Sequence, residues 1–371
     1  MTSPTIDTEG PLRLVVVGAG GMGRAWARTI QAHDDAELVG IADLAPAAAE
    51  AAAAETGIRG LALGSDAVEL ARRTGADAVV NATIPEAHHQ VTTAALLAGL
   101  PVLGEKPVAA SVAEGLSLAA AAEHTGQLFM VSQSRRYHRS LHQAKRRLET
   151  LGAVGVVAVD FFKAPHFGGF RDEMASPLLL DMAIHQFDMA RFLLDADPVS
   201  VSCEEYNPAW SWYTGDAAAT AVFAMEGGAR FVFNGSWCSP GFETSWNGSW
   251  RLSAERGTVL WDGEGEPGAD PDEAVPTVDD PGREIAGSLR EFTAALRHGS
   301  EPMGRVHANV MSLAMVEAAT QSASQGRRVA IDDVLERSYD AALATERNAE
   351  VLAVMKAWPS VRDALSQKEP Q

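Results

Sequence analysis

The segment LRLVVVGAGGMGRAWARTI (Leu12–Ile30) gives the strongest indication of the fold of this chain. It begins with a continuous apolar run, LRLVVV, which is typical of a buried strand. The run breaks into the pattern G-x-G-x-x-G, formed by Gly18, Gly20 and Gly23, and the residues after it have helical spacing. Strand, tight turn and helix form the context in which this pattern indicates a dinucleotide-binding unit, because the first amides of the helix can bind a pyrophosphate.

The next predicted strand supplies the residue that would select the cofactor. The segment AELVGIAD ends in Asp43, 25 residues after Gly18. An acid at this strand tip can accept hydrogen bonds from both ribose hydroxyls of NAD, and it would repel the 2′-phosphate of NADP. The first basic residue after Asp43 is Arg59, so no cation close in sequence compensates such a phosphate. We therefore expect the cofactor to be NAD.

Strands and helices continue to alternate up to residue 133. Further strands are predicted over 76–83, 101–106 and 127–133, with helical segments between them. This alternation predicts right-handed crossovers and a mostly parallel, doubly wound sheet, whose ligands bind beyond the carboxyl ends of the strands. Besides the glycine turn and Asp43, the residues expected at those ends are Thr83, Pro85, Glu105, Lys106 and Gln133.

A second chemistry-bearing stretch is SPLLLDMAIHQFDMARFLL (Ser176–Leu194). As a helix at about 100° per residue it is apolar almost all round, which predicts burial. Asp181, His185 and Asp188 nevertheless form one polar stripe, with Arg191 at its edge. Two interpretations are open: a solvated seam with an Asp188–Arg191 pair, or a stripe that lines a cavity where a carboxylate and an imidazole do chemistry.

The composition favours a globular protein of two domains. The chain has 371 residues, 46% of them hydrophobic and 21% charged. Its net charge of −19 argues against nucleic acid or an anionic membrane as a partner. We see no apolar run that could span a bilayer and no secretory signal, and two cysteines give no disulfide framework. These features predict a reduced, cytoplasmic enzyme.

Three segments taken in order, GAGGMGR, NATIPEAHHQVTTAALLAGLPVLGEKPVA and LLLDMAIHQFDMARFLL, resemble the glucose–fructose oxidoreductase / inositol dehydrogenase / MocA (Gfo/Idh/MocA) family. The most specific part is the Glu105-Lys106-Pro107 triplet followed downstream by D-x-x-x-H on a helix. The resemblance implies an α/β fold: an NAD-binding Rossmann domain over 12–133 and an α/β domain with an open, mostly antiparallel sheet over 134–331. It also implies that the nicotinamide lies between them and that the sheet is an oligomer interface. We therefore expect a homodimer or homotetramer, and a helical extension over 332–371.

The resemblance also assigns roles to individual residues. Lys106, Asp181 and His185 match the catalytic trio of the family. The positions that match dinucleotide contacts are Gly18, Gly20, Gly21, Met22, Gly23, Asp43, Thr83, Pro85, His88, Glu105 and Lys106. This chain departs from the family in having Met174-Ala175-Ser176-Pro177 where small glycine runs are common, and Gln186 where a second histidine often follows. Both departures bear on the substrate more than on the reaction.

The second half of the chain supplies candidates for substrate binding. Strands are predicted within 154–164, 217–226, 229–238 and 249–262, a basic helix with a solvated face over 137–150, and a mobile acidic loop over 262–282. Eight aromatic residues gather here, most of them expected to pack and some suited to stacking on a sugar or cyclitol: Phe167, Phe170, Trp210, Trp212, Tyr213, Trp237, Trp246 and Trp250. In the loop before the catalytic helix, His166 and Arg171 are candidates for binding substrate hydroxyls, together with Lys106, Asp181 and His185.

The expected activity is that of an NAD-dependent dehydrogenase that oxidises a secondary alcohol of a sugar, anhydrosugar or cyclitol. Two alternatives are a redox-neutral NAD enzyme that cleaves or isomerises a glycoside, and a non-catalytic NAD-binding sensor. His166, Asp181 and His185 could form a two-histidine, one-carboxylate metal set. Hydride transfer from an alcohol needs no metal when a base and a lysine are present, so we expect none.

Overall fold

The computed structural model describes residues 4–365, and these fall into two compact units. Unit 1 contains the described residues up to Ser134, together with Gly282–Val310 and the chain from Arg337 onward. Unit 2 contains Arg135–Pro281 and Met311–Glu336. The segment 282–310 and the described residues from Arg337 onward thus belong to unit 1.

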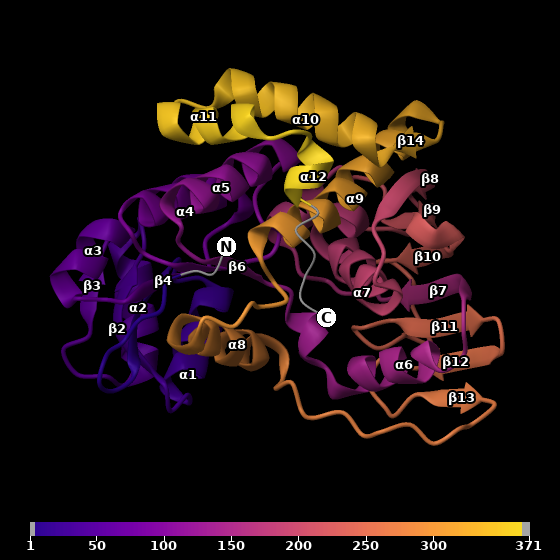
Figure 1. The fold of residues 1–371 in the computed structure, drawn as a ribbon, viewed down its shortest axis with the longest axis horizontal. Helices are drawn as coiled ribbons and strands as arrows, with labels where there is room; N and C mark the ends of the chain where they lie inside the picture. The colour runs from indigo at the N-terminus through magenta and orange to yellow at the C-terminus, as the bar shows by residue number, and fades with distance from the viewer. Residues whose placement is uncertain (1–3, 366–371) are drawn as a thin grey trace. The chain divides into compact units, whose positions relative to one another are not determined.

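Unit 1 is built on a six-stranded parallel sheet with the strand order β3-β2-β1-β4-β5-β6 (Figure 1). This is the order of the doubly wound dinucleotide-binding fold. Its strands are β1 (Leu12–Val17), β2 (Ala36–Ala42), β3 (Ala62–Gly64), β4 (Ala78–Asn81), β5 (Val102–Glu105) and β6 (Phe129–Ser132). The helices between them are α1 (Gly21–Gln31), α2 (Pro46–Thr56), α3 (Ala67–Thr74), α4 (Pro85–Leu97) and α5 (Val112–Thr125).

Five of these strands lie where the sequence predicts them, because a parallel sheet covered on both faces needs continuous apolar runs. Every residue of β4, β5 and β6 is buried. The edge strand β3 was not predicted. It has three residues, Ala-Leu-Gly, which are too few to give a periodic pattern.

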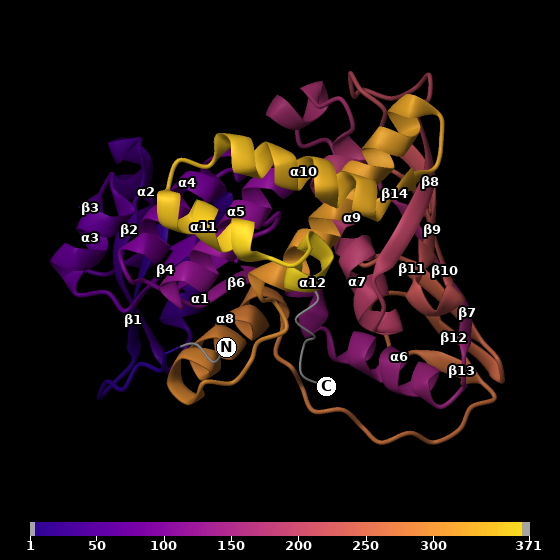
Figure 2. The same ribbon diagram turned by 45° about the horizontal axis from the view of Figure 1, so that its top comes forward.

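The C-terminal helices complete unit 1 by packing on α5. Helices α10 (Ile331–Thr345), α11 (Ala349–Ala357) and α12 (Val361–Leu365) follow the long helix α9 (Val306–Gln325), and α8 (Glu284–His298) precedes it. Figures 1 and 2 both show α11 alongside α5. Glu123 of α5 accepts hydrogen bonds from Trp358 Nε1 (3.0 Å) and His307 Nε2 (2.8 Å), and Ser117 bonds Glu346. Over its described residues, 332–365, the predicted extension therefore contains helices, and polar contacts fix it to the Rossmann domain. Residues 366–371 of the prediction lie outside the described residues.

Unit 2 is built on an eight-stranded sheet with the order β13-β12-β11-β7-β10-β9-β8-β14. Only the β7–β10 pair is parallel, as expected for an open, mostly antiparallel sheet. Its strands are β7 (Val154–Phe162), β8 (Pro198–Tyr206), β9 (Ala218–Met225), β10 (Arg230–Ser236), β11 (Ser249–Ala254), β12 (Gly257–Trp261), β13 (Gly268–Asp270) and β14 (Val329–Ala330). Its helices are α6 (Arg139–Glu149) and α7 (Ile184–Leu194), with short helical turns η1 (Ser134–Tyr137), η2 (Gly169–Glu173), η3 (Leu178–Ala183) and η4 (Glu226–Gly228).

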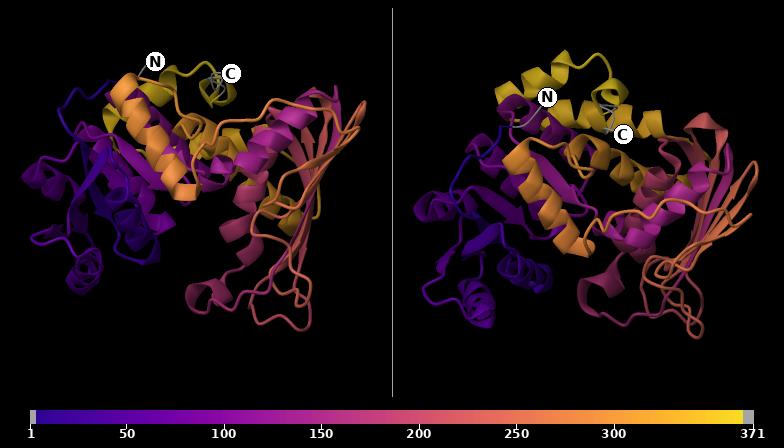
Figure 3. Two further views of the ribbon diagram at one scale, coloured as in Figure 1. Left: turned by 90° about the horizontal axis from the view of Figure 1, so that it is seen from below. Right: turned by 60° about the horizontal axis from the view of Figure 1, so that its bottom comes forward.

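The two faces of this sheet differ. Figure 3 shows α6 and α7 on the same face. Along β7, Val157, Val159 and Phe161 are fully buried, whereas Val156 is 41% exposed. This alternation is what a strand with one covered face requires, since successive side chains point to opposite faces.

The acidic segment 262–282 is not simply a mobile loop, which corrects the prediction. It contains β13, which pairs with β12, and its acids form ion pairs with the basic helix α6. Glu266 pairs with Arg139 (2.8 Å) and Asp272 pairs with Arg147 (2.6 Å). Figure 1 shows the remainder as an extended segment that passes α6. The basic face of α6 and the acidic segment thus contact each other through opposite charges, although the sequence pattern predicts a solvated face and a mobile loop.

The predicted helix over 176–194 is present, but its first part is a π-helix. Residues Leu178–Ala183 form the π-type turns of η3, and regular α-helix begins at Ile184. Because π-turns use i→i+5 hydrogen bonds, the 100° spacing that placed Asp181, His185 and Asp188 on one stripe does not hold across this segment. Such π-segments often occur at functional sites.

Two further findings concern the described residues. Cys203 and Cys238 are both buried and both free thiols, so the structure contains no disulfide between them. None of the helices within residues 4–365 combines the length and apolar character needed to cross a membrane.

Candidate functional site

The turn between β1 and α1 has the geometry of a pyrophosphate site. Gly18 has φ +94°, and a Cβ there would lie 2.6 Å from the carbonyl oxygen of Ala82. A Cβ on Gly23 would lie 1.7 Å from the carbonyl oxygen of Gly18, so only glycine allows α1 to pack this close to the turn. At Gly20 and Gly21 an added Cβ would meet nothing within 4 Å. Gly18 and Gly23 are therefore required by internal packing, whereas Gly20 and Gly21 leave open space in front of the backbone.

Helix α1 also offers its first amides to a ligand. Its N-cap is Gly20, and no side chain caps it. Uncapped amides at a helix N-terminus favour an anion, because the N–H groups and the helix dipole point at it. The open space at Gly20 and Gly21 lies in front of these amides, so this part of the chain fits a dinucleotide diphosphate. Met22, predicted to touch the cofactor, is 44% exposed in the same turn.

Asp43 follows β2 and is fixed by two backbone amides. Its Oδ2 accepts a hydrogen bond from the Ala19 amide (2.7 Å) and its Oδ1 accepts one from the Ala45 amide (2.8 Å). These bonds tie the acid to the glycine turn. Each carboxylate oxygen has a second lone pair that can accept a bond from a ribose hydroxyl.

The loop that follows β4 is organised by Asn81, a residue that sequence analysis did not single out. Asn81 is buried, and its Oδ1 accepts hydrogen bonds from the Thr83 amide (3.2 Å) and hydroxyl (2.7 Å). His88 is only 2% exposed. Its Nδ1 lies 2.7 Å from the carbonyl oxygen of Pro107 and its Nε2 lies 3.1 Å from that of Thr83. His88 thus links the backbones of two strand-end loops, and burial lowers the pKa of its imidazole. An asparagine within a buried apolar strand was the available sequence signal for this network.

Glu105 anchors the end of β5 to helix α1. Its Oε1 accepts a hydrogen bond from Trp26 Nε1 (2.8 Å) and its Oε2 accepts one from the Lys106 amide (3.2 Å). Burial raises the pKa of the Glu105 carboxyl, while the bond from Trp26 acts in the opposite direction. Lys106 follows directly and is partly exposed. Glu105 therefore fixes the backbone position from which the Lys106 side chain extends.

In unit 2, Asp181 and His185 lie at the junction of η3 and α7. His185 is 5% exposed in the first turn of α7, and Asp181 is partly exposed in η3. Arg171, from the preceding turn η2, donates from Nε to Asp181 Oδ2 at 2.6 Å. Its guanidinium also contacts the rings of Phe167 (5.2 Å) and Phe170 (4.7 Å). The structure thus brings Arg171 and Asp181 together as an ion pair.

The aromatic residues of unit 2 divide into packed and exposed groups. Trp237, Trp250 and Tyr213 are buried, as expected for packing. His166 is exposed and stacks on Trp212, with ring centroids 3.7 Å apart. The exposed members are Phe167, Phe170, Trp210 and Trp246.

The polar side chains at the end of the α7 stripe have a structural role. Asp188 is 1% exposed and accepts hydrogen bonds from Arg136 Nε (2.7 Å) and Nη2 (3.0 Å), and from Ser312 Oγ (2.8 Å). Arg191 pairs with Asp197 at 2.6 Å. Asp188 is therefore neutralised by Arg136 in the core of unit 2. A solvated seam is excluded, because the residue is buried.

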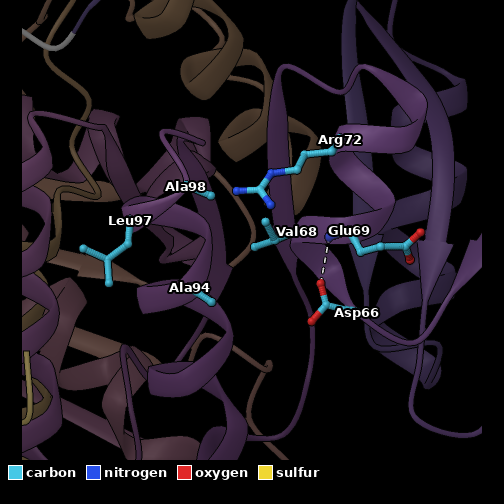
Figure 4. Close-up of a pocket in the computed structure, with 7 residues that line it drawn as sticks. All are labelled: Asp66, Val68, Glu69, Arg72, Ala94, Leu97 and Ala98. Atoms are coloured by element: carbon cyan, nitrogen blue, oxygen red, sulfur yellow. Dashed lines mark hydrogen bonds between the residues drawn. The ribbon is translucent and has the colours of Figure 1, made fainter.

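Two other features of the described residues lie outside this arrangement. A surface hollow of about 510 Å³ lies between α3 and α4 (Figure 4). None of the residues predicted to bind the dinucleotide lines it; the lining consists of Asp66, Val68, Glu69, Arg72, Ala94, Leu97 and Ala98. Within residues 4–365 the structure also has no group of three or more histidine, cysteine or acidic side chains placed to hold a metal ion.

Comparison with known proteins agrees with this fold. The D-apiose dehydrogenase of Paraburkholderia graminis is 27% identical over 374 residues, which cover 94% of this chain and 96% of that protein. The inositol 2-dehydrogenase of Rhizobium meliloti is 32% identical over 200 residues, which cover 52% of this chain and 57% of that protein. An oxidoreductase from Agrobacterium radiobacter, solved in complex with NAD+, L-tartaric acid and magnesium, has a TM-score of 0.78 at 21% identity and covers 87% of this chain and 99% of that one.

Two family models match consecutive parts of the chain. The model described as "Oxidoreductase family, NAD-binding Rossmann fold" matches residues 12–133. The model described as "GFO/IDH/MocA C-terminal domain" matches residues 125–260. Together they cover residues 12–260, which contain all six strands of the first sheet and strands β7 to β11 of the second, and they agree with the resemblance found in the sequence. The chain therefore belongs to the GFO/IDH/MocA family of oxidoreductases, enzymes that act on CH–OH groups with NAD(P).

Proposed function

We propose that this protein is an NAD-dependent dehydrogenase that oxidises a secondary alcohol of a sugar or cyclitol. The observation that carries the proposal is the glycine turn of unit 1, which leaves open space in front of the uncapped α1 amides beside Asp43. The names of relatives, a D-apiose dehydrogenase and an inositol 2-dehydrogenase, support the substrate class.

Gly20, Gly21 and the first amides of α1 would hold the diphosphate of the cofactor, and Asp43 the adenosine ribose. Bound NAD+ would supply the hydride acceptor. In the proposed chemistry His185 accepts the proton of the substrate hydroxyl, since an imidazole suits a general base near neutral pH. Lys106 donates a hydrogen bond to the same oxygen and stabilises the developing alkoxide charge. The substrate carbon then loses a hydride, and a ketone and a proton are formed.

Asp181 has a positioning role in this proposal. Its Oδ2 accepts a hydrogen bond from Nε of Arg171. Its carboxylate lies in the π-segment that precedes His185 and can orient substrate hydroxyls.

The test of the proposed activity is the appearance of reduced nicotinamide absorbance with NAD+ and a panel of monosaccharides, anhydrosugars and cyclitols, starting with D-apiose and inositol. We expect Lys106→Ala and His185→Gln each to lower kcat by about 10²–10⁴-fold, because each removes charge stabilisation or proton transfer. Lys356→Ala, an exposed lysine on α11, is the matched control and should retain wild-type rates.

A flat trace over the whole panel, with NAD+ binding intact, would contradict the dehydrogenase. Consumption of a sugar without net NADH would then identify a redox-neutral enzyme. If no sugar is consumed, the result would instead identify an NAD-binding protein without catalytic activity.

The preference for NAD over NADP is part of the proposal and rests on Asp43. We expect Asp43→Asn to remove the charge that repels a 2′-phosphate. The amide oxygen can still accept a hydrogen bond from Ala19 or from Ala45, whereas the amide nitrogen cannot accept the other. The ratio of kcat/KM for NAD+ to that for NADP+ should fall on the order of tenfold or more. Asp34→Asn, an exposed acid before β2, is the control. A wild-type enzyme that prefers NADP+ would contradict this assignment.

A further inference from the structure

The side chain of Arg171 is presented in a way that the dehydrogenase chemistry alone does not require. A substrate that carries only hydroxyl groups could be bound by Asp181, by neutral amides or by other hydroxyls. Arg171 is instead a fixed cation in an exposed turn directly before the π-segment that carries Asp181. Its side chain is 34% exposed, so part of the guanidinium is accessible to a ligand.

The contacts of Arg171 use only one of its three nitrogens. Nε donates to Asp181 Oδ2 at 2.6 Å. Within residues 4–365 neither terminal nitrogen of Arg171 makes a hydrogen bond, so the Nη1–Nη2 edge of the fork retains its donors. This edge matches the two oxygens of a carboxylate or of a phosphate group, in a geometry that single-point cations cannot offer.

The surroundings of Arg171 restrict the orientation of this fork. Phe167 and Phe170 lie 5.2 Å and 4.7 Å from the guanidinium carbon, and both rings are exposed rather than part of the core. Together with the Nε bond they limit rotation of the planar group. A fork already held in place loses less conformational entropy when a ligand binds.

The acidic neighbours on the same turn do not occupy that edge. Glu173 accepts a hydrogen bond from Thr214 (3.2 Å). Oδ1 of Asp172 is buried rather than turned to solvent. Over the chain as a whole the net charge is −19, which repels an anionic ligand at long range. Recognition of such a ligand therefore needs a local cation with directed donors, and Arg171 provides one.

We propose that Arg171 binds an oxyanion on the substrate, so that the enzyme acts on a sugar bearing a carboxylate or a phosphate rather than on a neutral polyol. The reaction in this inference rests on the proposed dehydrogenase function, whereas the binding of the oxyanion by Arg171 does not depend on it. In this proposal the guanidinium binds two anionic groups at once. Nε donates to the Asp181 carboxylate, and Nη1 and Nη2 donate to the oxyanion of the substrate.

The experiment is a calorimetric titration of wild-type protein in saturating NAD+ with three matched hexoses: glucose, glucuronate and glucose 6-phosphate. The galactose and mannose series are titrated in the same way. We expect at least one anionic member to bind about tenfold or more tightly than its neutral parent, as charge-assisted bonds to a fork would give. Preference for the uronate identifies a sugar acid, and preference for the phosphate a sugar phosphate.

Two variants test whether Arg171 is the cause. Arg171→Gln should abolish the preference for the anion, because it lowers the affinity for the anionic hexose much more than the affinity for its neutral parent. Arg171→Lys, which keeps the charge and loses the fork, should retain only part of the preference. Arg139→Gln, which removes an exposed ion-paired arginine of α6, is the matched control and should behave as wild type. Thermal unfolding of each variant checks that it is folded.

The inference is overturned if the neutral hexose binds as well as its anionic partners, if Arg171→Gln weakens all of them equally, or if none of the series binds. NADH production measured on the same samples separates the two proposals. If only neutral sugars are turned over, the dehydrogenase proposal stands and the oxyanion proposal is rejected. Arg171-dependent binding of an anion without NADH supports the oxyanion site and rejects the dehydrogenase.

Discussion

At the scale of single residues, the glycine fingerprint divides into two kinds of position that the sequence pattern does not distinguish. Gly18 and Gly23 are required by backbone contacts inside the protein, whereas Gly20 faces open space. The pattern G-x-G-x-x-G therefore combines a folding requirement with a ligand requirement. Substitution by alanine separates them.

We expect Gly23→Ala to destabilise the protein by about 1–3 kcal/mol, because its Cβ would overlap the carbonyl oxygen of Gly18 and force the turn to move. Gly20→Ala meets no protein atom, and its φ of −70° suits alanine. This variant should unfold at the wild-type temperature and bind NAD+ more weakly. Thermal unfolding and an NAD+ titration on both variants check the prediction. Equal loss of stability in the two would show that the space at Gly20 is not open.

At the scale of elements, the segment that leads into η3 is held by β8 and the loop after it. Glu205 of β8 accepts a hydrogen bond from Ser176 (3.0 Å), and the amide of Asp216 donates to the carbonyl oxygen of Ala175 (2.9 Å). Burial, with a smaller contribution from the charge of Asp216, raises the pKa of the Glu205 carboxyl to about 7. The start of η3 is thus fixed next to an acid that resists ionisation.

This pKa predicts a stability that falls as pH rises. The folded state holds the Glu205 proton more tightly than the unfolded chain, whose carboxyl titrates near its usual value of 4.5. The stabilisation is therefore complete below about pH 4.5 and is lost as pH rises through 7. We expect Glu205→Gln to be more stable than wild type by about 1–3 kcal/mol at pH 8, with the difference vanishing near pH 5.

Denaturant unfolding at the two pH values measures this difference. Glu204→Gln, the exposed neighbour on the same strand, is the control and should show no such pH dependence. A Glu205→Gln variant that is less stable at both pH values would mean that the carboxylate makes favourable bonds that its neutral form cannot.

At the scale of the whole molecule, the outer face of the second sheet is open and partly apolar. The strand register places Val156, Val222 and Leu260 on this face, and they are 41%, 39% and 53% exposed. Arg230 and Arg251 lie on the same face, next to Val156 and Leu260. Exposed apolar side chains on a sheet favour association of proteins. We propose that this face joins copies of the chain into the homodimer or homotetramer predicted from the sequence.

We expect the double variant Val222→Asp, Leu260→Asp to be a monomer at micromolar concentration, because it places charges in the proposed interface. Leu97→Asp, an equally exposed leucine on α4, is the matched control and should keep the wild-type mass. Light scattering after size-exclusion chromatography gives the masses. A wild-type monomer would remove the basis for the interface.

The amino-acid sequence is enough to predict the Rossmann unit, its strand-end residues and the family, because each depends on local patterns: apolar runs, a glycine turn and short motifs at fixed spacing. It also placed Asp181 and His185 on one helical stretch. The fold itself was needed to show that Arg171 is the partner of Asp181, that Arg136 neutralises Asp188, and that the acidic segment 262–282 pairs with α6. The same holds for the packing of the C-terminal helices on α5 through Glu123 and Trp358. The physical reason is the same in each case: pairing of charges and docking of helices depend on which distant segments meet, and a local pattern carries no information about that.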